Sequence, residues 1–173
     1  MDALERYLNS FGKSVVNKAK GILKKKGKVV SGDLLNSIKF RITKDKGNLS
    51  VEFLMIDYGT FVDKGVSGTQ QKRTYVDYKG QRVKTPYSYG KSRDGGLTRG
   101  LDKWIVRRGI APRDEQGRFI SRKSLKFLIA RKIYTKGIEG ISFFQKPLQL
   151  ELRGFYDKVG KAVKHDIENI ITV

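Results

Sequence analysis

Apolar residues recur at helical spacing near both ends of the chain. Near the N-terminus they fall three or four positions apart, with lysines between them, at Leu4, Leu8, Phe11, Val15, Ala19 and Ile22. This spacing predicts an amphipathic helix that ends in the lysine-rich run 24–28. A similar stripe from Leu148 to Ile170 follows Pro147 and predicts one long final helix, which Gly154 and Gly160 weaken without interrupting.

Alternation of apolar and polar residues predicts two β-hairpins between these helices. Residues 38–43 alternate, and residues 49–55 form their partner strand after the turn-forming run Asp-Lys-Gly-Asn. Residues 74–78 and 81–85 flank a Lys-Gly pair and predict a second, exposed hairpin.

The central part of the chain predicts two further helices. One runs over 97–108, and Pro112 prevents its continuation. The next is capped by Ser121 or Ser124 and runs to about Thr135. The residues expected to face inward are Leu97, Leu101, Trp104 and Ile105 on the first helix, and Leu125, Leu128, Ile129 and Ile133 on the second.

Charge is the strongest feature of the composition. The 173 residues include 37 lysines and arginines against 17 acidic residues, a net charge of +20. Residues 1–30 carry +6 and residues 66–136 carry +14, while the remaining stretches sum to zero. Such an excess favours a polyanionic partner or an acidic protein, and charge alone does not separate the two. The chain has no cysteine and no apolar run long enough for a membrane span.

Catalytic chemistry has little support in the sequence. The single histidine, His165, has no second histidine or cysteine at ligand spacing, so no metal site is expected. Gly90-Lys91-Ser92 lacks the upstream glycine of a phosphate-binding loop, because Thr85 stands there. We therefore expect a protein that is not an enzyme and has no catalytic residue, cofactor or metal.

Tyrosines and cations are interleaved in the predicted second hairpin. Tyr and Arg are favoured at protein interfaces, and aromatic rings between cations also suit stacking on nucleic-acid bases. We place a protein interface first, and its candidate residues are Tyr75, Tyr78, Arg82, Tyr87 and Tyr89. The candidates for contact with DNA or an acidic partner are Lys72, Arg73, Lys84, Arg107, Arg108 and Lys123.

Three short stretches, in their order and spacing, carry a family resemblance. They are Ser31–Ile38 (SGDLLNSI), Tyr58–Gly65 (YGTFVDKG) and Gly140–Leu148 (GISFFQKPL). Together they resemble the neck and tail-completion proteins of tailed bacteriophages, including the minor tail family. Residues 101–110 and 130–138 are similar to a central stretch that some members carry. Residues 66–96 exceed the compact pattern of that family.

The resemblance implies an α+β fold, with the N-terminal and C-terminal helices packed on a small, mostly antiparallel sheet. Residues 1–65 would form the first half of this core and residues 137–173 its C-terminal helix. Residues 66–96 would form an extended hairpin arm, and residues 97–136 a basic helical insertion.

The resemblance also implies a homo-oligomeric ring at the head–tail junction, between the portal or adaptor and the tail proteins. The ring would belong to the virion neck, surround the DNA channel and assemble in the host cytoplasm, without a membrane. Nonspecific contact with packaged DNA is a secondary expectation. The main alternative is a basic protein that binds DNA or RNA nonspecifically, and a small hydrolase is the third class.

Overall fold

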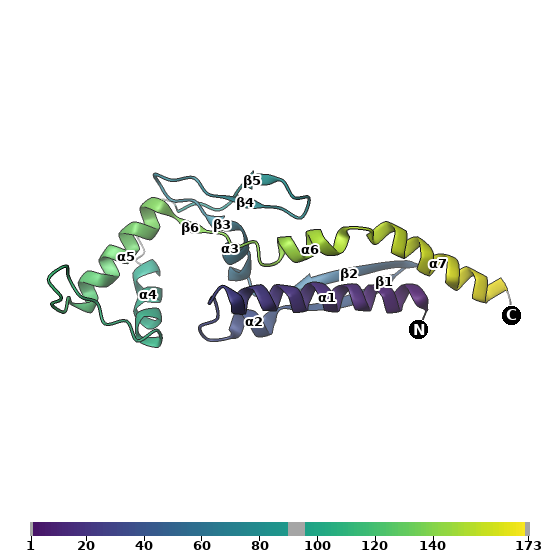
Figure 1. Ribbon diagram of the computed structural model, residues 1–173, viewed down its shortest axis with the longest axis horizontal. Coiled ribbons are helices and arrows are strands. Elements are labelled where there is room, and N and C mark those ends of the chain that lie inside the picture. The colour runs from purple at the N-terminus through teal and green to yellow at the C-terminus, as the bar shows by residue number, and fades with distance from the viewer. Residues whose placement is uncertain (1, 90–95, 172–173) are drawn as a thin grey trace. The chain divides into compact units, whose positions relative to one another are not determined.

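The computed structural model describes residues 2–89 and 96–171, and describes side chains throughout these ranges except at 96–99. It has the expected α+β class, with helices and small antiparallel sheets along the chain (Figure 1). The chain divides into two compact units. Unit 1 comprises residues 1–59, 76–82 and 142–173, and unit 2 comprises residues 60–75 and 83–141.

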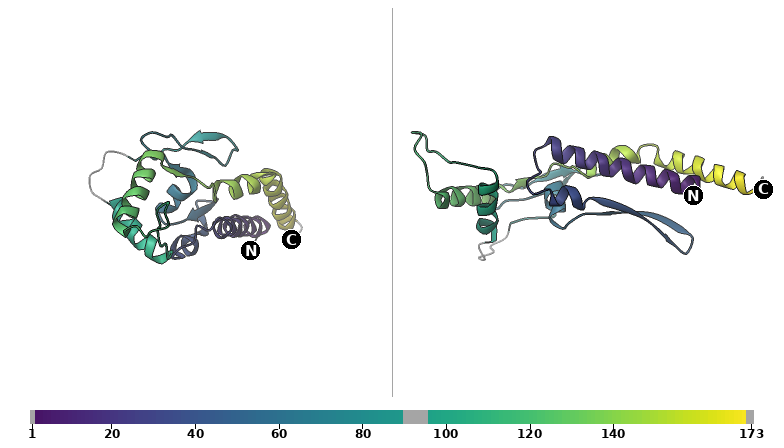
Figure 2. Two further views of the ribbon diagram at one scale, coloured as in Figure 1. Left: turned by 60° about the vertical axis from the view of Figure 1, so that its left-hand side comes forward. Right: turned by 90° about the horizontal axis from the view of Figure 1, so that it is seen from below.

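Unit 1 is built around the predicted N-terminal helix, α1 (Ala3–Lys25). α1 packs against a hairpin on one side and against the C-terminal helices on another (Figure 2). Its buried side chains include Leu8, Phe11, Val15 and Ala19 of the predicted stripe, and also Leu23, whereas the predicted Ile22 is only half-buried. Gly27, at φ +60°, lies directly after the helix, where a left-handed residue commonly ends one.

The hairpin of unit 1 pairs β1 (Lys39–Asp45) with β2 (Asn48–Leu54). Asp45 is paired with Asn48, so Lys46 and Gly47 form a two-residue turn, and both have positive φ. A short helix, α2 (Asp33–Ser37), leads into β1. The first predicted hairpin is confirmed.

Aromatic side chains join the hairpin to the helices of unit 1. The ring of Phe53 lies 6.2 Å from that of Phe11 and 5.2 Å from that of Phe144, centroid to centroid. Phe40, opposite Phe53 in the register, lies so close to Gly12 that a Cβ there would be 2.3 Å from its ring. The glycine therefore lets α1 approach the strand.

The prediction of a single C-terminal helix is wrong. The chain forms α6 (Gln145–Leu152) and α7 (Phe155–Ile171), with a break at Arg153 and Gly154. Gly154 has φ +69°, a left-handed conformation that a helix interior does not allow. Both helices pack on α1, so the break lets each of them follow it separately.

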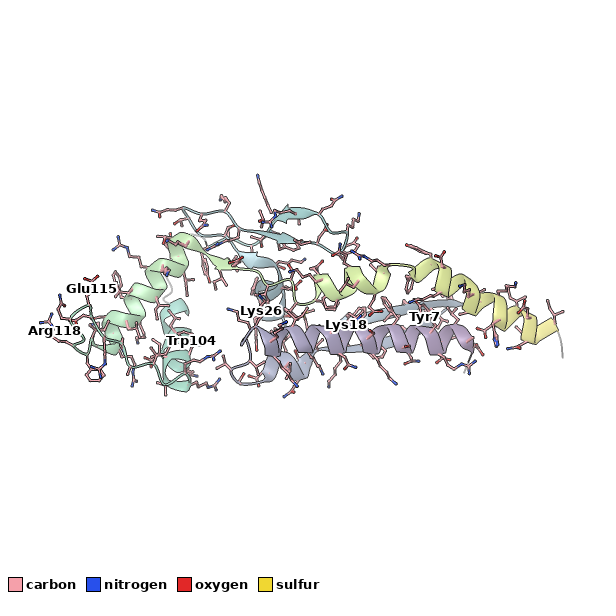
Figure 3. The ribbon with its side chains drawn as sticks, viewed as in Figure 1. Tyr7, Lys18, Lys26, Trp104, Glu115 and Arg118 are labelled. Atoms are coloured by element: carbon pink, nitrogen blue, oxygen red, sulfur yellow. The ribbon has the colours of Figure 1, made fainter. Side chains whose placement is uncertain are left out.

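Polar contacts fix α6 to α1. The Glu151 carboxylate accepts a hydrogen bond from Ser14 Oγ at 2.5 Å and forms an ion pair with Lys18, which is labelled in Figure 3. Burial alone would raise the pKa of Glu151, but the bonds from Lys18 and Ser14 outweigh it and lower that pKa. The ionised carboxylate is therefore the form that holds the two helices together.

A carboxylate of α7 caps the start of α1. The backbone N–H groups of Ala3 and Leu4 donate to the two oxygens of Asp166, at 2.7 and 2.9 Å. These bonds, from Leu4 first and then from Ala3, lower the pKa of Asp166. The first turn of a helix has no internal acceptors for its N–H groups, so Asp166 supplies them from a residue far away in the sequence.

We expect Asp166→Ala to lower the melting temperature at neutral pH. Because the folded pKa lies below the unfolded value of about 3.9, the carboxylate stabilises the fold above that value. The stabilisation is lost as the pH falls through the folded pKa. The difference between native and variant chains should therefore close in acid, in melting curves followed by circular dichroism. Glu168→Ala, which removes an exposed carboxylate of the same helix, is the control, and an equal effect there would contradict the assignment.

Unit 2 contains two short strands and two central helices. β3 (Gly65–Val66) follows α3 (Tyr58–Lys64) and pairs antiparallel with β6 (Ile138–Glu139). α4 (Gly96–Arg107) buries Leu101 and Ile105 and packs against α5 (Arg122–Lys136). Of the two predicted candidates, Ser121 caps α5, since its Oγ accepts a hydrogen bond from the backbone N–H of Ser124.

The second predicted hairpin is also present, as β4 (Thr74–Val76) and β5 (Arg82–Lys84). Asp77 organises its turn, since its Oδ1 accepts hydrogen bonds from the backbone N–H groups of Lys79 and Gln81. Residues 90–95, the end of the predicted arm, lie outside the described residues.

Candidate functional site

The base of the predicted arm is part of the packing of unit 2. Tyr87 places its ring edge-on to that of Phe61, with 4.6 Å between centroids. The Lys64 ammonium lies over the Tyr75 ring, 5.8 Å from its centroid. Tyr89 is half-buried, and this burial raises the pKa of its hydroxyl. Three of the five predicted interface residues therefore contact or are partly covered by their own chain.

Backbone hydrogen bonds tie the same region together. Ser67 donates its N–H to Tyr87 O at 2.8 Å and accepts at its own carbonyl from Tyr89 N at 2.9 Å. Thr85 Oγ1 donates to Gly65 O at 2.7 Å, and both residues are buried. Deletion of residues 66–96 would therefore remove part of the packing of unit 2. A loss of assembly in such a variant would not identify an interface.

The tip of the hairpin belongs to unit 1. The backbone N–H of Tyr78 donates to Gln145 Oε1 of α6 at 3.0 Å, while the Tyr78 side chain stays 43% exposed. Arg82 is also exposed. The structure thus separates the five predicted interface residues into a tip with two exposed side chains and a base with three half-buried rings.

The predicted contacts for DNA or an acidic partner differ in their surroundings. Arg73 is half-buried and donates from Nε to the Lys136 carbonyl at 2.8 Å, so this nitrogen holds unit 2 together. The other five are exposed: Lys72 before β4, Lys84 at the end of β5, Arg107 and Arg108 at the end of α4, and Lys123 at the start of α5.

Possible metal ligands are not grouped in the described part of the chain. The described residues include no group of three histidine, cysteine or acidic side chains that could hold a metal ion. His165 lies on α7, where its Nδ1 is 3.0 Å from Asn169 Nδ2. A pocket of about 160 Å³ near the start of α2 is lined mainly by aliphatic groups such as Leu23, Val30 and Leu34. Among the described helices, none is both long and apolar enough to cross a membrane.

No protein-family model matches this chain, and no curated protein or solved structure matches it significantly.

Two apolar surfaces emerge that were not identified from the sequence. On α7, Tyr156, Ile167, Ile170 and Ile171 are between 51% and 83% exposed. On α5, Phe127 and Leu128 are 62% and 54% exposed. The prediction that Leu128 faces inward is wrong, because the side of α5 that packs on α4 carries the half-buried Leu125 and Ile129, and Leu128 lies at the edge of that side.

A signal for both surfaces was present in the sequence. Tyr156 and Phe127 fall outside the predicted inward stripes, so each helix carries more apolar residues than one face holds. A helix that is apolar on more than one side normally has more than one partner.

The loop between α4 and α5 is mainly polar and self-contained. Asp114 accepts hydrogen bonds from the backbone N–H groups of Gln116 and Arg118 and pairs with the Arg118 side chain at 2.9 Å. Glu115 and Arg118 lie on this loop in Figure 3. The loop therefore forms a tight reversal, in which the Asp114 carboxylate serves local structure.

Proposed function

We propose that the chain is a structural subunit of a tailed-phage virion. It would form an oligomeric ring at the head–tail junction, connect the portal or adaptor to the tail, and surround the DNA channel. This proposal combines the family resemblance with a surface for self-association on α7.

The local structures of the three resembling stretches support the proposal. Ser31–Ile38 forms α2 and leads into β1, and Gly140–Leu148 leads into α6. Tyr58–Gly65 forms α3 and ends at Gly65, which has φ +75°. Gly65 and Gly140 come from different stretches and lie so close together that a Cβ on Gly65 would be 2.5 Å from Gly140 N. Two of the stretches therefore meet in the fold, although they are far apart in sequence.

The observation that carries the proposal is an uncovered apolar stripe along α7. One side of the helix packs on α1, where Phe155 places its ring 4.8 Å from that of Phe11. The remaining apolar residues follow a spacing of four and three along another side. We call them the α7 stripe: the exposed Tyr156, Ile167, Ile170 and Ile171, with the half-buried Val163 between them. This spacing is that of a helix that packs on a second helix.

The charge of α7 favours another copy of the chain as the partner. Residues 155–171 contain three lysines and three acidic residues, so the helix is neutral although the chain carries +20. Two copies of a strongly basic surface would repel each other, whereas two copies of this neutral helix would not. The α7 stripe is therefore suited to a contact between identical subunits.

The native mass of the purified chain tests the proposal. We expect a single species at a whole multiple of 19.7 kDa, visible in negative stain as rings with a central opening. The measurement belongs at about 0.15 M salt, where repulsion between distant charges is largely screened. A species of one chain's mass at micromolar concentration would contradict the proposal.

A further inference from the structure

α5 carries apolar side chains on more than one face. Leu125, Ile129 and Ile133 repeat every four residues, are half-buried and face the packing with α4. Phe127 lies on the far side of the helix, Leu128 lies between it and Leu125, and both are mostly exposed. Apolar side chains of this size gain free energy from burial, and no other described part of unit 2 covers them.

Cations surround this exposed pair on the same helix. On an α-helix, side chains three or four positions apart are neighbours. Lys123 and Arg131 are therefore neighbours of Phe127, while Arg131 and Lys132 are neighbours of Leu128. All three cations are exposed. We call these five residues the α5 outer face.

The charge of the wider segment agrees with this local pattern. Residues 96–136 contain 12 basic and 3 acidic residues, a net charge of +9. Two of the acids are already paired, since Asp102 lies 3.2 Å from Lys126 and Asp114 lies 2.9 Å from Arg118. The potential near the α5 outer face is therefore strongly positive.

We propose that the α5 outer face binds an acidic amphipathic helix of a different protein. Apolar residues of that helix would cover Phe127 and Leu128, while its carboxylates would pair with Lys123, Arg131 and Lys132. A second copy of the chain is disfavoured here, because it would bring two such basic segments together. This inference is independent of the ring, because it concerns another helix and another kind of partner.

The exposed apolar pair also separates this surface from a nucleic-acid site. Phosphates are bound by lysine and arginine, and bases stack on aromatic rings. Leu128 contributes to neither contact, although it is 54% exposed beside Arg131 and Lys132. A protein partner uses both kinds of side chain, since apolar contacts at the centre of an interface are commonly surrounded by charged ones.

Two synthetic peptides of identical composition test the inference on the full-length chain. The first carries leucines at positions i, i+3, i+4 and i+7 with glutamates elsewhere, and the second scrambles that order. Fluorescence anisotropy of the labelled peptides measures their affinity. We expect the amphipathic peptide to bind at least about tenfold more tightly than the scrambled one, because only its leucines reach Phe127 and Leu128 together. Equal affinities would overturn the inference.

Variants then locate the binding surface. The double variant F127S/L128S should lose about tenfold or more in affinity for the amphipathic peptide. Arg131→Glu should weaken binding while it keeps both apolar side chains. Leu150→Ser is the matched control, because Leu150 is an exposed leucine of α6, and should bind as the native chain does. Unchanged affinity in both α5 variants would overturn the inference.

A DNA duplex of arbitrary sequence serves as the competing probe. Tighter binding of the duplex than of the amphipathic peptide, unaffected by F127S/L128S, would assign the surface to nucleic acid and overturn the inference. The native mass of F127S/L128S should equal that of the unchanged chain. A failure of the peptide test is therefore distinguishable from a failure of ring formation.

Discussion

Gly137→Ala should lower the melting temperature of unit 2 by more than about 10 °C. Gly137 has φ +71° and ψ −169°, a conformation almost restricted to glycine. A Cβ there would lie 2.1 Å from Val66 O and 2.5 Å from Gly68 N, both backbone atoms that a rotamer change does not move. The strain and the overlap together should cost about 3 kcal/mol or more.

The single tryptophan allows this effect to be followed in unit 2. Trp104 lies on α4, as Figure 3 shows, so its fluorescence reports the unfolding of that unit. Gly100→Ala is the matched control, since Gly100 lies within the same helix and a Cβ there meets nothing within 4 Å. This change should leave the melting temperature equal or raise it, because alanine favours a helix by about 1 kcal/mol over glycine. A Gly137→Ala chain that melts within about 2 °C of the native chain would contradict this prediction. It would show that the backbone around Gly137 and Val66 relaxes at little cost in free energy.

Local chemistry explains which elements were predictable. The first hairpin follows from strict alternation on both sides of a turn that needs positive φ, which Lys46 and Gly47 supply. The N-cap of α5 follows from a serine at the right place, Ser121. In each case, residues within a few positions of one another decide the structure.

Long-range contacts explain what the sequence did not reveal. A glycine within a helical pattern lowers helix stability by only about 1 kcal/mol, which does not decide between a continuous helix and a break. At Gly154 the outcome depends on packing, because α6 and α7 each contact α1. The cap that Asp166 provides to Ala3 and Leu4 joins residues more than 160 positions apart, and no local motif indicates it.

The candidate surfaces show the same limit. Helical spacing identifies residues that share a face, but it does not show whether another element covers that face. Ile167 and Ile170 extend the stripe predicted for the final helix, yet α1 begins at Ala3 and leaves them 51% and 77% exposed. Conversely, the sequence predicts Tyr75 and Tyr87 as interface residues, and the structure places them against Lys64 and Phe61 of the same chain.

The double variant I167S/I170S should remain folded and lose self-association. Both side chains are largely exposed in the single chain, so their replacement removes little from its own core. Burying an isoleucine contributes about 1.5–3 kcal/mol, and two changes at each contact should therefore weaken it by two orders of magnitude or more. Native mass spectrometry should then show one chain's mass, with an unchanged circular dichroism spectrum. Phe127→Ser, on the basic α5 outer face, is the control and should still assemble.

Salt provides an independent check on the same surface. The α7 stripe is apolar and its helix is neutral, so assembly through it should persist as salt is raised from about 0.15 M to 1 M. Assembly through the hairpin tip would instead involve Lys79 and Arg82, which are exposed cations whose attractions salt screens. Two results together would assign the interface to the hairpin and not to α7. The native assembly would dissociate in high salt, and the I167S/I170S variant would still assemble at low salt.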